Sequence, residues 1–215
     1  MVTTQEAVWF GTENFLSQCL LIMMLVGMQS GYMGLIPQEW RTLLGGPALT
    51  GLSGVPIISR TSSGPTATVF DPANVGTNNK TISMLLGYPF EHQTLGVYGE
   101  ANQYFAASDQ VGGLAFPSGT RSVLFVGRHA TTFCYGYGTS NQALHGTVDA
   151  NGVMTCYDPT STDKGGHGYP YIHQVWAYDA NDMLAVKNRT KQPWDVKPYA
   201  IWKLTDINNN GSAGA

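Results

Sequence analysis

Short apolar runs separated by turn residues fill most of the chain from residue 36 to residue 205. Residues 112–138, GGLAFPSGTRSVLFVGRHATTFCYGYG, show this pattern most clearly, because Leu114–Phe116 and Val123–Val126 flank a Pro-Ser-Gly turn. Two apolar runs joined by such a turn predict a β-hairpin. Polar and aromatic residues follow directly, as is typical of loops beside a rigid sheet.

The same pattern occurs on both sides of this hairpin. An earlier hairpin is predicted from Val55–Ser59 and Thr66–Phe70. A later one is predicted from Gln174–Tyr178 and Met183–Lys187, joined by a turn at Asp179–Asp182. No long helical pattern separates these runs, which argues against an α/β fold. Single strands are predicted at Val153–Tyr157 and Tyr199–Leu204.

The spacing of the hairpins predicts the architecture. They recur about every 50–60 residues, which favours propeller blades or an open array of β-meanders. A Greek-key sandwich is the alternative. We therefore expect a mainly β protein of antiparallel hairpins or meanders that is partly propeller-like. Three hairpins are too few to close a propeller, so the chain is either part of one or has its open edges covered by its first residues or by other subunits.

The first residues differ from the rest of the chain. Thr3 and Glu6 have the spacing of a capping box, and residues 15–28 are rich in Leu, Ile and Met, which predicts a helix over about residues 4–28. This helix either packs on its own domain or docks into a neighbouring subunit. The candidate interface residues are Leu20, Met23, Met24 and Met28. The expected organisation is a helical segment (1–35), a β-rich domain (36–205) and a flexible tail (206–215).

Charge and hydropathy narrow the expected partners. The apolar run Cys19–Val26 is too short to span a membrane. A signal peptide begins with a basic region, and no Lys or Arg precedes Arg41, so a signal peptide is not expected. The net charge is -3 and the chain has no Lys/Arg run, so a nucleic-acid partner is not expected. Charged residues make up only 12% of the chain, which suits permanent contacts with other protein subunits.

Two of the three cysteines have similar surroundings. Cys134 follows Phe133 and precedes a tyrosine, and Cys156 lies in the predicted strand Val153–Tyr157. They are either cross-strand disulfide partners or two reduced thiols in a β core. The chain has no Cys-x-x-Cys pair and no regular His/Cys spacing, so neither a metal site nor a cofactor is expected.

Candidate ligand-binding residues cluster after the central hairpin. Arg128 and His129 end its second strand, and an arginine there can grip a carboxylate or phosphate with two parallel hydrogen bonds. Aromatic side chains can stack on sugar rings or anchor protein interfaces. We expect Trp176, Tyr178 and Trp202 to lie in the core. The tyrosines expected on exposed loops beside Gly or Pro are Tyr135, Tyr137, Tyr169 and Tyr171.

Catalytic signatures are weak. Ser118 or Ser122 could be combined with His129 and Asp109, but no Gly-x-Ser-x-Gly elbow supports such a set. Glu91 and Glu100 are the acids least explained by turns, and glycoside hydrolysis needs two facing carboxyl groups. No catalytic residues are assigned on this basis.

Several long runs carry a family resemblance. They are GGLAFPSGTRSVLFVGRH, FCYGYGTS, TCYDPTSTDKGGHGYPYIHQVWAYDANDMLAVKN and KQPWDVKPYAIWKL. Over about residues 35–205 the chain resembles a family of bacterial and phage-encoded β-propeller-like proteins that are distantly similar to glycosidase-type propellers. The resemblance implies a propeller-like fold and a virion- or tail-associated role, without an established activity. The chain departs from the family in its Met-rich first helix and in stopping where relatives continue with another blade.

These observations favour a non-enzymatic structural or interaction protein. We expect a phage virion subunit, associated with the tail or capsid, that assembles with other chains and binds surface glycans. Its expected location is the virion or the extracellular surface. The alternative is a glycoside hydrolase-like β-propeller enzyme or a fragment of one.

Overall fold

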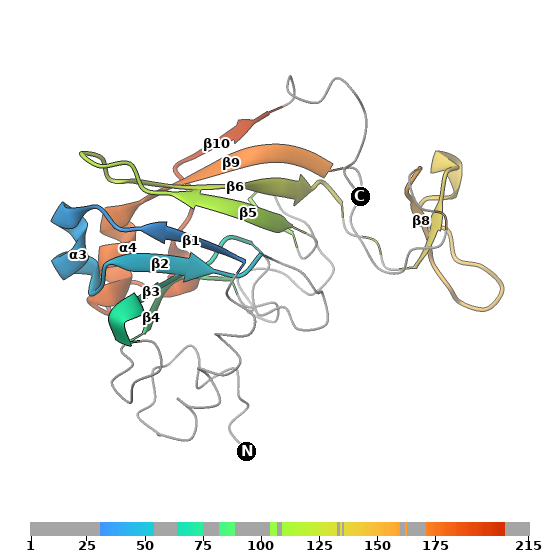
Figure 1. Cartoon of the computed structure of the whole chain (residues 1–215). Helices are drawn as coiled ribbons and strands as arrows, with labels where there is room; N and C mark the ends of the chain where they lie inside the picture. The colour runs from blue at the N-terminus through green and yellow to red at the C-terminus, as the bar shows by residue number, and fades with distance from the viewer. Residues whose placement is uncertain are drawn as a thin grey trace, which may run out of the picture.

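Two four-stranded antiparallel sheets form the body of the protein in this computed structural model (Figure 1). A two-stranded sheet and two α-helices complete the described structure, which confirms the mainly β, antiparallel prediction. The helix predicted over residues 4–28 and the predicted tail lie outside the described residues. The structure describes residues 31–53, 64–74, 82–88, 104–106, 109–132, 134, 136–159, 162 and 171–204.

The first sheet is a meander whose strands pair in chain order. Its strands are β1 (Tyr32–Leu35), β2 (Ala48–Gly51), β3 (Ala67–Phe70) and β4 (Ser83–Leu86). Because β1 pairs with β2, the last residues of the segment predicted to be helical belong to the β domain. The predicted strand Val55–Ser59 lies outside the described residues, and β2 and β4 occupy both edges of β3.

A short helix, α3 (Gln38–Leu44), connects β1 to β2 and was not predicted. Pro37 precedes its first turn, a position that suits proline because the backbone N–H groups there have no helical partner. Gly45 ends the helix with φ 92°, and its N–H donates to the Arg41 carbonyl. The Gly-Gly-Pro run at residues 45–47 therefore contains the C-terminal stop of this helix.

The second sheet contains β5 (Gln110–Ala115), β6 (Ser122–Ala130), β9 (Tyr171–Asp179) and β10 (Ala200–Lys203), in the order β10-β9-β6-β5. The predicted central hairpin is confirmed, since β5 and β6 pair antiparallel, and β10 confirms the last predicted strand. β6 and β9 pair over their full length, from Ser122 opposite Asp179 to Ala130 opposite Tyr171.

The predicted hairpin after β9 is wrong. Residues 180–187 form the helix α4 (Ala180–Lys187), and β9 pairs with β6 and β10. The Asp179 side chain accepts a hydrogen bond from the Asn181 N–H, so it is an N-cap. Aspartate favours turns and helix starts alike, and the burial of Met183 and Val186 against the domain decides for the helix.

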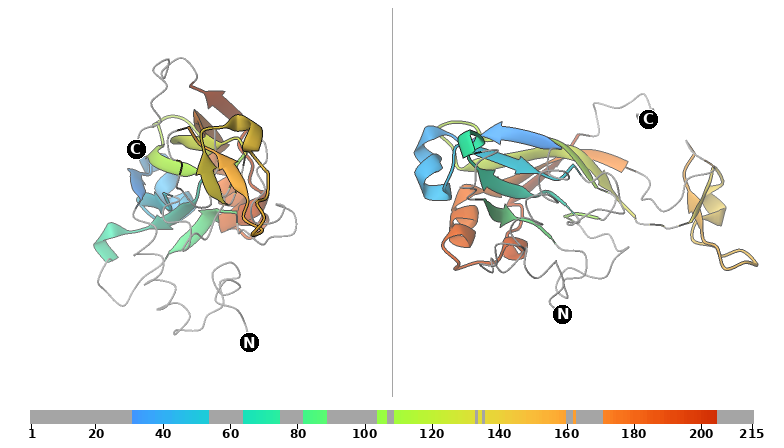
Figure 2. Two further views of the ribbon diagram at one scale, coloured as in Figure 1. Left: turned by 90° about the vertical axis from the view of Figure 1, so that its right-hand side faces the viewer. Right: turned by 60° about the horizontal axis from the view of Figure 1, so that its bottom comes forward.

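A separate small unit is inserted between β6 and β9. It contains β7 (Tyr137–Thr139), the 3-10 turn η3 (Gln142–Leu144) and β8 (Thr155–Tyr157), with β7 and β8 parallel. In Figure 1 and in the right-hand view of Figure 2 it stands apart from the two sheets. We call Cys134 and residues 136–159 the disulfide lobe. β8 confirms the strand predicted around Cys156.

The core lies where the two sheets meet. β1 lies beside β5, and the Val111 N–H donates to the Ser53 carbonyl. α4 packs against β4, the last strand of the first sheet, so it covers one side of the core (Figure 1). Trp176 and Tyr178 are fully buried, as predicted. The largest other buried side chains are Tyr88, Phe105, Phe125, Ile36, Leu44, Leu49, Leu85, Leu86 and Met183. The remaining short helical turns are η2 (Pro72–Asn74) and η4 (Pro193–Asp195).

Three buried tyrosines hold the core together through their hydroxyl groups. The Tyr32 hydroxyl donates to the Thr66 carbonyl at 2.8 Å, and the Tyr88 hydroxyl is 3.0 Å from that of Tyr178. Burial raises the pKa of Tyr32 to about 12 and raises the pKa values of Tyr88 and Tyr178 as well. Each raised pKa means that the folded state retains the proton more strongly than the unfolded state.

Alkaline pH is therefore expected to unfold the protein. Stability is intact below about pH 10, the unfolded pKa of tyrosine. Between about pH 10 and 12, Tyr32 alone lowers the free energy of unfolding by about 1.4 kcal/mol for each pH unit, because only the unfolded state loses the proton. Urea unfolding across this range measures the slope, and Tyr32→Phe should make it shallower. Complete ionisation of all tyrosines in a still folded protein would contradict this account.

Candidate functional site

A buried carboxylate–imidazole pair lies at the end of the second sheet, where β6 leaves it. Both oxygens of the Asp109 carboxylate are within 3.0 Å of His129 Nδ1. The carboxylate also accepts the backbone N–H groups of Ala106 and Ala130, each at 2.8 Å. Burial raises the pKa of Asp109, and these hydrogen bonds oppose that rise. The arrangement fixes the orientation of the imidazole and joins residue 106 to the end of β6.

His129 is thus a core residue, although the sequence grouped it with Arg128 as a surface ligand. Its ring meets Trp176 edge to face at a centroid distance of 6.4 Å, and both Asp109 and His129 are buried. Strand alternation explains the difference, because neighbouring residues of β6 point to opposite faces of the sheet.

The serines that could complete a catalytic set lie far from this pair. Ser122 begins β6 and His129 nearly ends it, so seven residues of extended strand place their Cα atoms about 23 Å apart. Ser118 lies further away still, in the turn before β6. A Ser-His-Asp arrangement needs hydrogen-bond contact between serine and histidine, so these residues do not form one.

The face of the second sheet opposite to the one that carries His129 brings two predicted ligand residues together, Arg128 and Tyr171. The Arg128 guanidinium carbon lies 4.1 Å from the centroid of the Tyr171 ring. In the register of β6 and β9, Arg128 is opposite His173 and Ala130 is opposite Tyr171. Arg128 and Tyr171 are therefore diagonal neighbours on adjacent strands. We call the face of this sheet that carries Arg128 and Tyr171 the outer face. It is the face away from Trp176 and the core.

Trp202 lies on the same outer face, which corrects the prediction that it is a core residue. It is opposite Val175 in β9, whereas the neighbouring Ile201 is opposite the buried Trp176. The Trp202 side chain is 49% exposed, and Val126, which is also opposite Val175, is 42% exposed. Sequence reasoning missed Trp202 as a surface residue. The signal that could have found it is its alternation relative to its strand neighbours once β10 is registered against β9.

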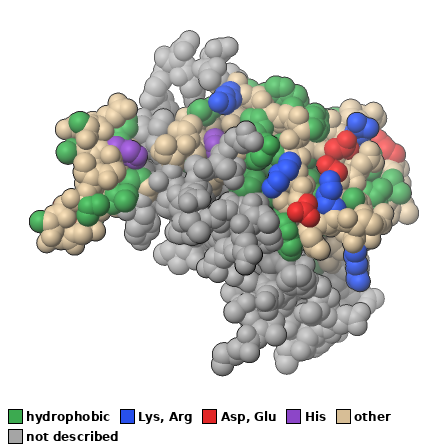
Figure 3. Space-filling model, turned by 180° about the vertical axis from the view of Figure 1, so that it is seen from behind, with side chains coloured by type: hydrophobic (Ala, Val, Ile, Leu, Met, Phe, Trp, Pro, Cys, Tyr) green, Lys and Arg blue, Asp and Glu red, His purple; other side chains and the backbone are tan. Residues whose placement is uncertain are grey.

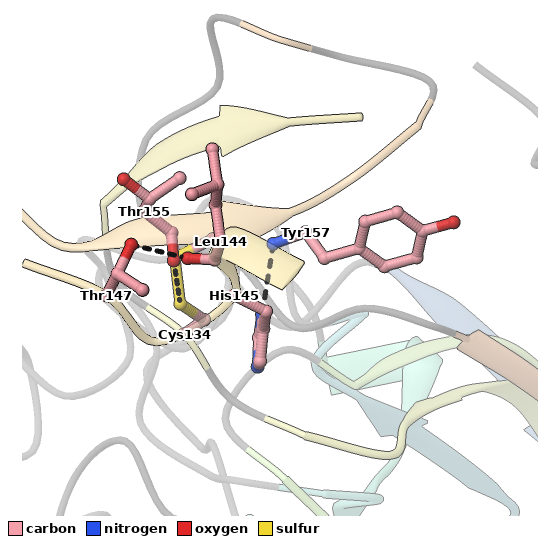
Figure 4. Close-up of a disulfide and its surroundings, with 7 residues drawn as sticks. Cys134, Leu144, His145, Thr147, Thr155 and Tyr157 are labelled. Carbon is pink, nitrogen blue, oxygen red and sulfur yellow. Dashed lines mark hydrogen bonds between the residues drawn. A yellow bond between two sulfur atoms is a disulfide. The ribbon is translucent and has the colours of Figure 1, made fainter. Parts of the chain in front are cut away.

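The disulfide lobe contains the covalent link between Cys134 and Cys156, whose sulfur atoms are 2.02 Å apart. Of the two states that the sequence left open, the structure therefore contains the disulfide. Close to the bond, His145 Nδ1 accepts the Tyr157 N–H at 3.0 Å and the Thr147 hydroxyl donates to the Leu144 carbonyl (Figure 4). The bond between His145 and Tyr157 connects the loop between β7 and β8 to the strand that carries Cys156, and the bond between Thr147 and Leu144 lies within that loop.

The surface of the disulfide lobe carries little charge and exposes several large hydrophobic side chains among uncharged polar ones. The lobe has no Lys or Arg, and its Asp158 is buried. One oxygen of Asp149 accepts two backbone N–H groups of its own turn. From behind, the lobe shows hydrophobic, histidine and uncharged side chains, while Lys, Arg, Asp and Glu lie over the rest of the molecule (Figure 3). Its exposed large hydrophobic residues are Tyr137, Leu144, Val148 and Met154.

Of the remaining candidate residues, Tyr137 lies within the described part of the chain. Tyr137 is exposed as predicted, but on β7 in the lobe, away from Arg128. Tyr135, Tyr169 and the candidate interface residues Leu20, Met23, Met24 and Met28 lie outside the described residues. Within the described ranges, no group of three or more His, Cys, Asp or Glu side chains is arranged to hold a metal ion. None of the helices described has both the length and the hydropathy of a membrane span.

Comparisons of the chain with protein-family models, with curated proteins and with solved structures found no match. The resemblance to propeller-like proteins therefore stays a prediction.

Proposed function

We propose that this protein is a non-enzymatic structural subunit that assembles with further copies of itself through the disulfide lobe. In this proposal the assembly is a phage virion, in its tail or capsid, and the second sheet is available to bind surface glycans. The resemblance described from the sequence supports the virion part of the proposal. The geometry of the lobe supports the assembly part.

The exposed hydrophobic side chains of the lobe, together with its low charge, are the observation that carries the proposal. Four large hydrophobic side chains are exposed on a unit of fewer than thirty residues that has no basic residue. Permanent protein interfaces are apolar and depleted in charged residues in this way. The lobe also contains a two-stranded parallel sheet, and parallel sheets are normally covered on both faces. A neighbouring subunit would provide that cover.

The disulfide supports a location outside the reducing cytosol. Disulfides persist in secreted proteins and on virion and cell surfaces, whereas cytosolic thiols are kept reduced. The Cys134–Cys156 bond closes a segment of 22 residues within the lobe proposed to make the contacts. A virion or extracellular surface is therefore the location that we propose.

The sheets support a propeller-like arrangement as part of the same proposal. Each four-stranded sheet keeps its strands in chain order, which is the construction of a propeller blade. Their first strands, β1 and β5, lie side by side, as the inner strands of adjacent blades do. For the glycosidase alternative, Glu91 and Glu100 lie outside the described residues, and no observation favours it over assembly.

The assembly proposal predicts a change in molar mass when the lobe surface is altered. The full chain should be an oligomer by light scattering. The double variant Tyr137→Ser/Val148→Ser should raise the dissociation constant on the order of a hundredfold, because each truncation removes about 1–2 kcal/mol of apolar burial at the interface. Leu35→Ser is the matched control, since Leu35 is 70% exposed on β1, outside the lobe. A monomeric full chain, or equal loss in the control, would contradict the proposal.

A further inference from the structure

The outer face of the second sheet has a regular layout that follows from its register. One row across the sheet contains Trp202, Val175 and Val126 on β10, β9 and β6. The next row contains His173 and Arg128 on β9 and β6. Trp202 and Arg128 are two strands and two residues apart, which places their Cα atoms about 12 Å from each other.

Among the described residues, none supplies an acceptor for the hydrogen-bond donors of Arg128. Its Nε atom is buried, and no hydrogen bond or ion pair of this side chain occurs within the described part of the chain. Its close contact is the stacking on Tyr171, which holds the guanidinium plane without using its N–H groups. A buried donor without a partner is costly, so this position favours a ligand that brings an acceptor. The planar fork of arginine matches a carboxylate best.

Trp202 offers a different kind of contact at the other end of this surface. Its indole ring is half-exposed, in the same row as the exposed Val126, so it presents a flat apolar surface to the solvent. Sugar rings stack on such aromatic faces. A nucleic acid, by contrast, requires many cations to replace its counterions, and this protein has a net charge of -3.

We propose that the outer face binds an acidic saccharide, with a sugar carboxylate held by Arg128 and a sugar ring stacked on Trp202. This inference rests on the glycan-binding part of the proposed function and names its ligand class and its site. It is independent of assembly through the disulfide lobe, which uses other residues.

Binding to a panel of glycans tests the proposal. Immobilised uronic-acid and sialic-acid oligosaccharides should bind the full-length protein, and the methyl esters of the same sugars should bind at least tenfold more weakly. Arg128→Gln and Arg128→Lys should each weaken binding on the order of tenfold or more, since neither substitution keeps the bidentate fork. Trp202→Ala should also weaken binding about tenfold, and because its side chain is half-exposed the variant should fold normally.

Two controls separate this site from general electrostatics. Lys203→Gln removes a neighbouring positive charge, but Lys203 is opposite Gln174, so it belongs to the other face of the sheet and should leave binding unchanged. Inorganic phosphate should compete only at far higher concentration than the saccharide. Failure of all acidic glycans to bind, equal binding of the esters, or full binding by Arg128→Gln would overturn the proposal. Light scattering of the same variants reports on assembly separately, so a failure here leaves the assembly proposal standing.

Discussion

Replacing Asp109 with alanine is expected to lower the free energy of unfolding by about 3–5 kcal/mol, because three buried hydrogen-bond partners lose their acceptor and each such loss costs about 1–3 kcal/mol. The substitution leaves His129 Nδ1 and the backbone N–H groups of Ala106 and Ala130 without their acceptor. The imidazole packs against Trp176, so its displacement also disturbs the central aromatic side chain of the core. Urea unfolding followed by tryptophan fluorescence measures the change.

Two further variants test whether the lost buried acceptor causes this loss of stability. Asp109→Asn keeps one acceptor oxygen and should cost about 1–3 kcal/mol, the range for a single unsatisfied buried polar group. Asp149→Ala removes a carboxylate that also accepts two backbone N–H groups, but at an exposed turn of the lobe, so it should cost about 1 kcal/mol or less. If Asp109→Ala unfolds at the same urea concentration as the unmodified protein, the pair contributes nothing to stability.

Removing the disulfide is expected to open the lobe while leaving the sheets intact. A bridge that closes 22 residues is worth about 3 kcal/mol by the loop-entropy model. In Cys134→Ser/Cys156→Ser, the amide hydrogens of β7 and β8 should therefore exchange about 100-fold faster. The exchange of β6 and β9 should stay unchanged, because their pairing does not depend on the lobe. Hydrogen exchange with mass spectrometry resolves the two regions.

The remaining cysteine provides the control for this experiment. Cys19 is not part of the Cys134–Cys156 bond, so Cys19→Ser should leave exchange in the lobe unchanged. Treatment of the unmodified protein with a reductant should reproduce the double variant. Equal exchange in the oxidised protein and the double variant would mean that hydrogen bonds such as Tyr157 N–H to His145 hold the lobe without the bridge. In that case the lobe would also keep its proposed interface after reduction.

Local patterns predicted several elements correctly. The hairpin of β5 and β6 follows from two apolar runs around a Pro-Ser-Gly turn, and both its strands are formed by nearby residues. β8 and β10 were also predicted from their apolar and aromatic residues. In each case the signal is contained within a few neighbouring residues, so no distant part of the chain is needed to interpret it.

Ambiguous local signals led to errors at the two helices. Asp179 suits a turn and an N-cap equally, so the residues after β9 resembled a second hairpin strand. The choice of helix depends on the burial of Met183 in a core that also contains Leu85 and Leu86 of β4. α3 was missed for a similar reason, since Gly45 terminates helices as well as forming turns.

The candidate site depended on tertiary structure more than the fold did. By itself, the sequence determined that the chain is mainly β and low in charge, and it selected Arg128, Tyr171 and two cysteines as candidate residues. Only the tertiary structure decided that His129 points inward to Asp109, that Trp202 points outward near Arg128, and that the cysteines meet. The physical reason is that alternation along a strand shows which residues share a face. Which face is buried depends on strands and helices that pack from elsewhere in the chain.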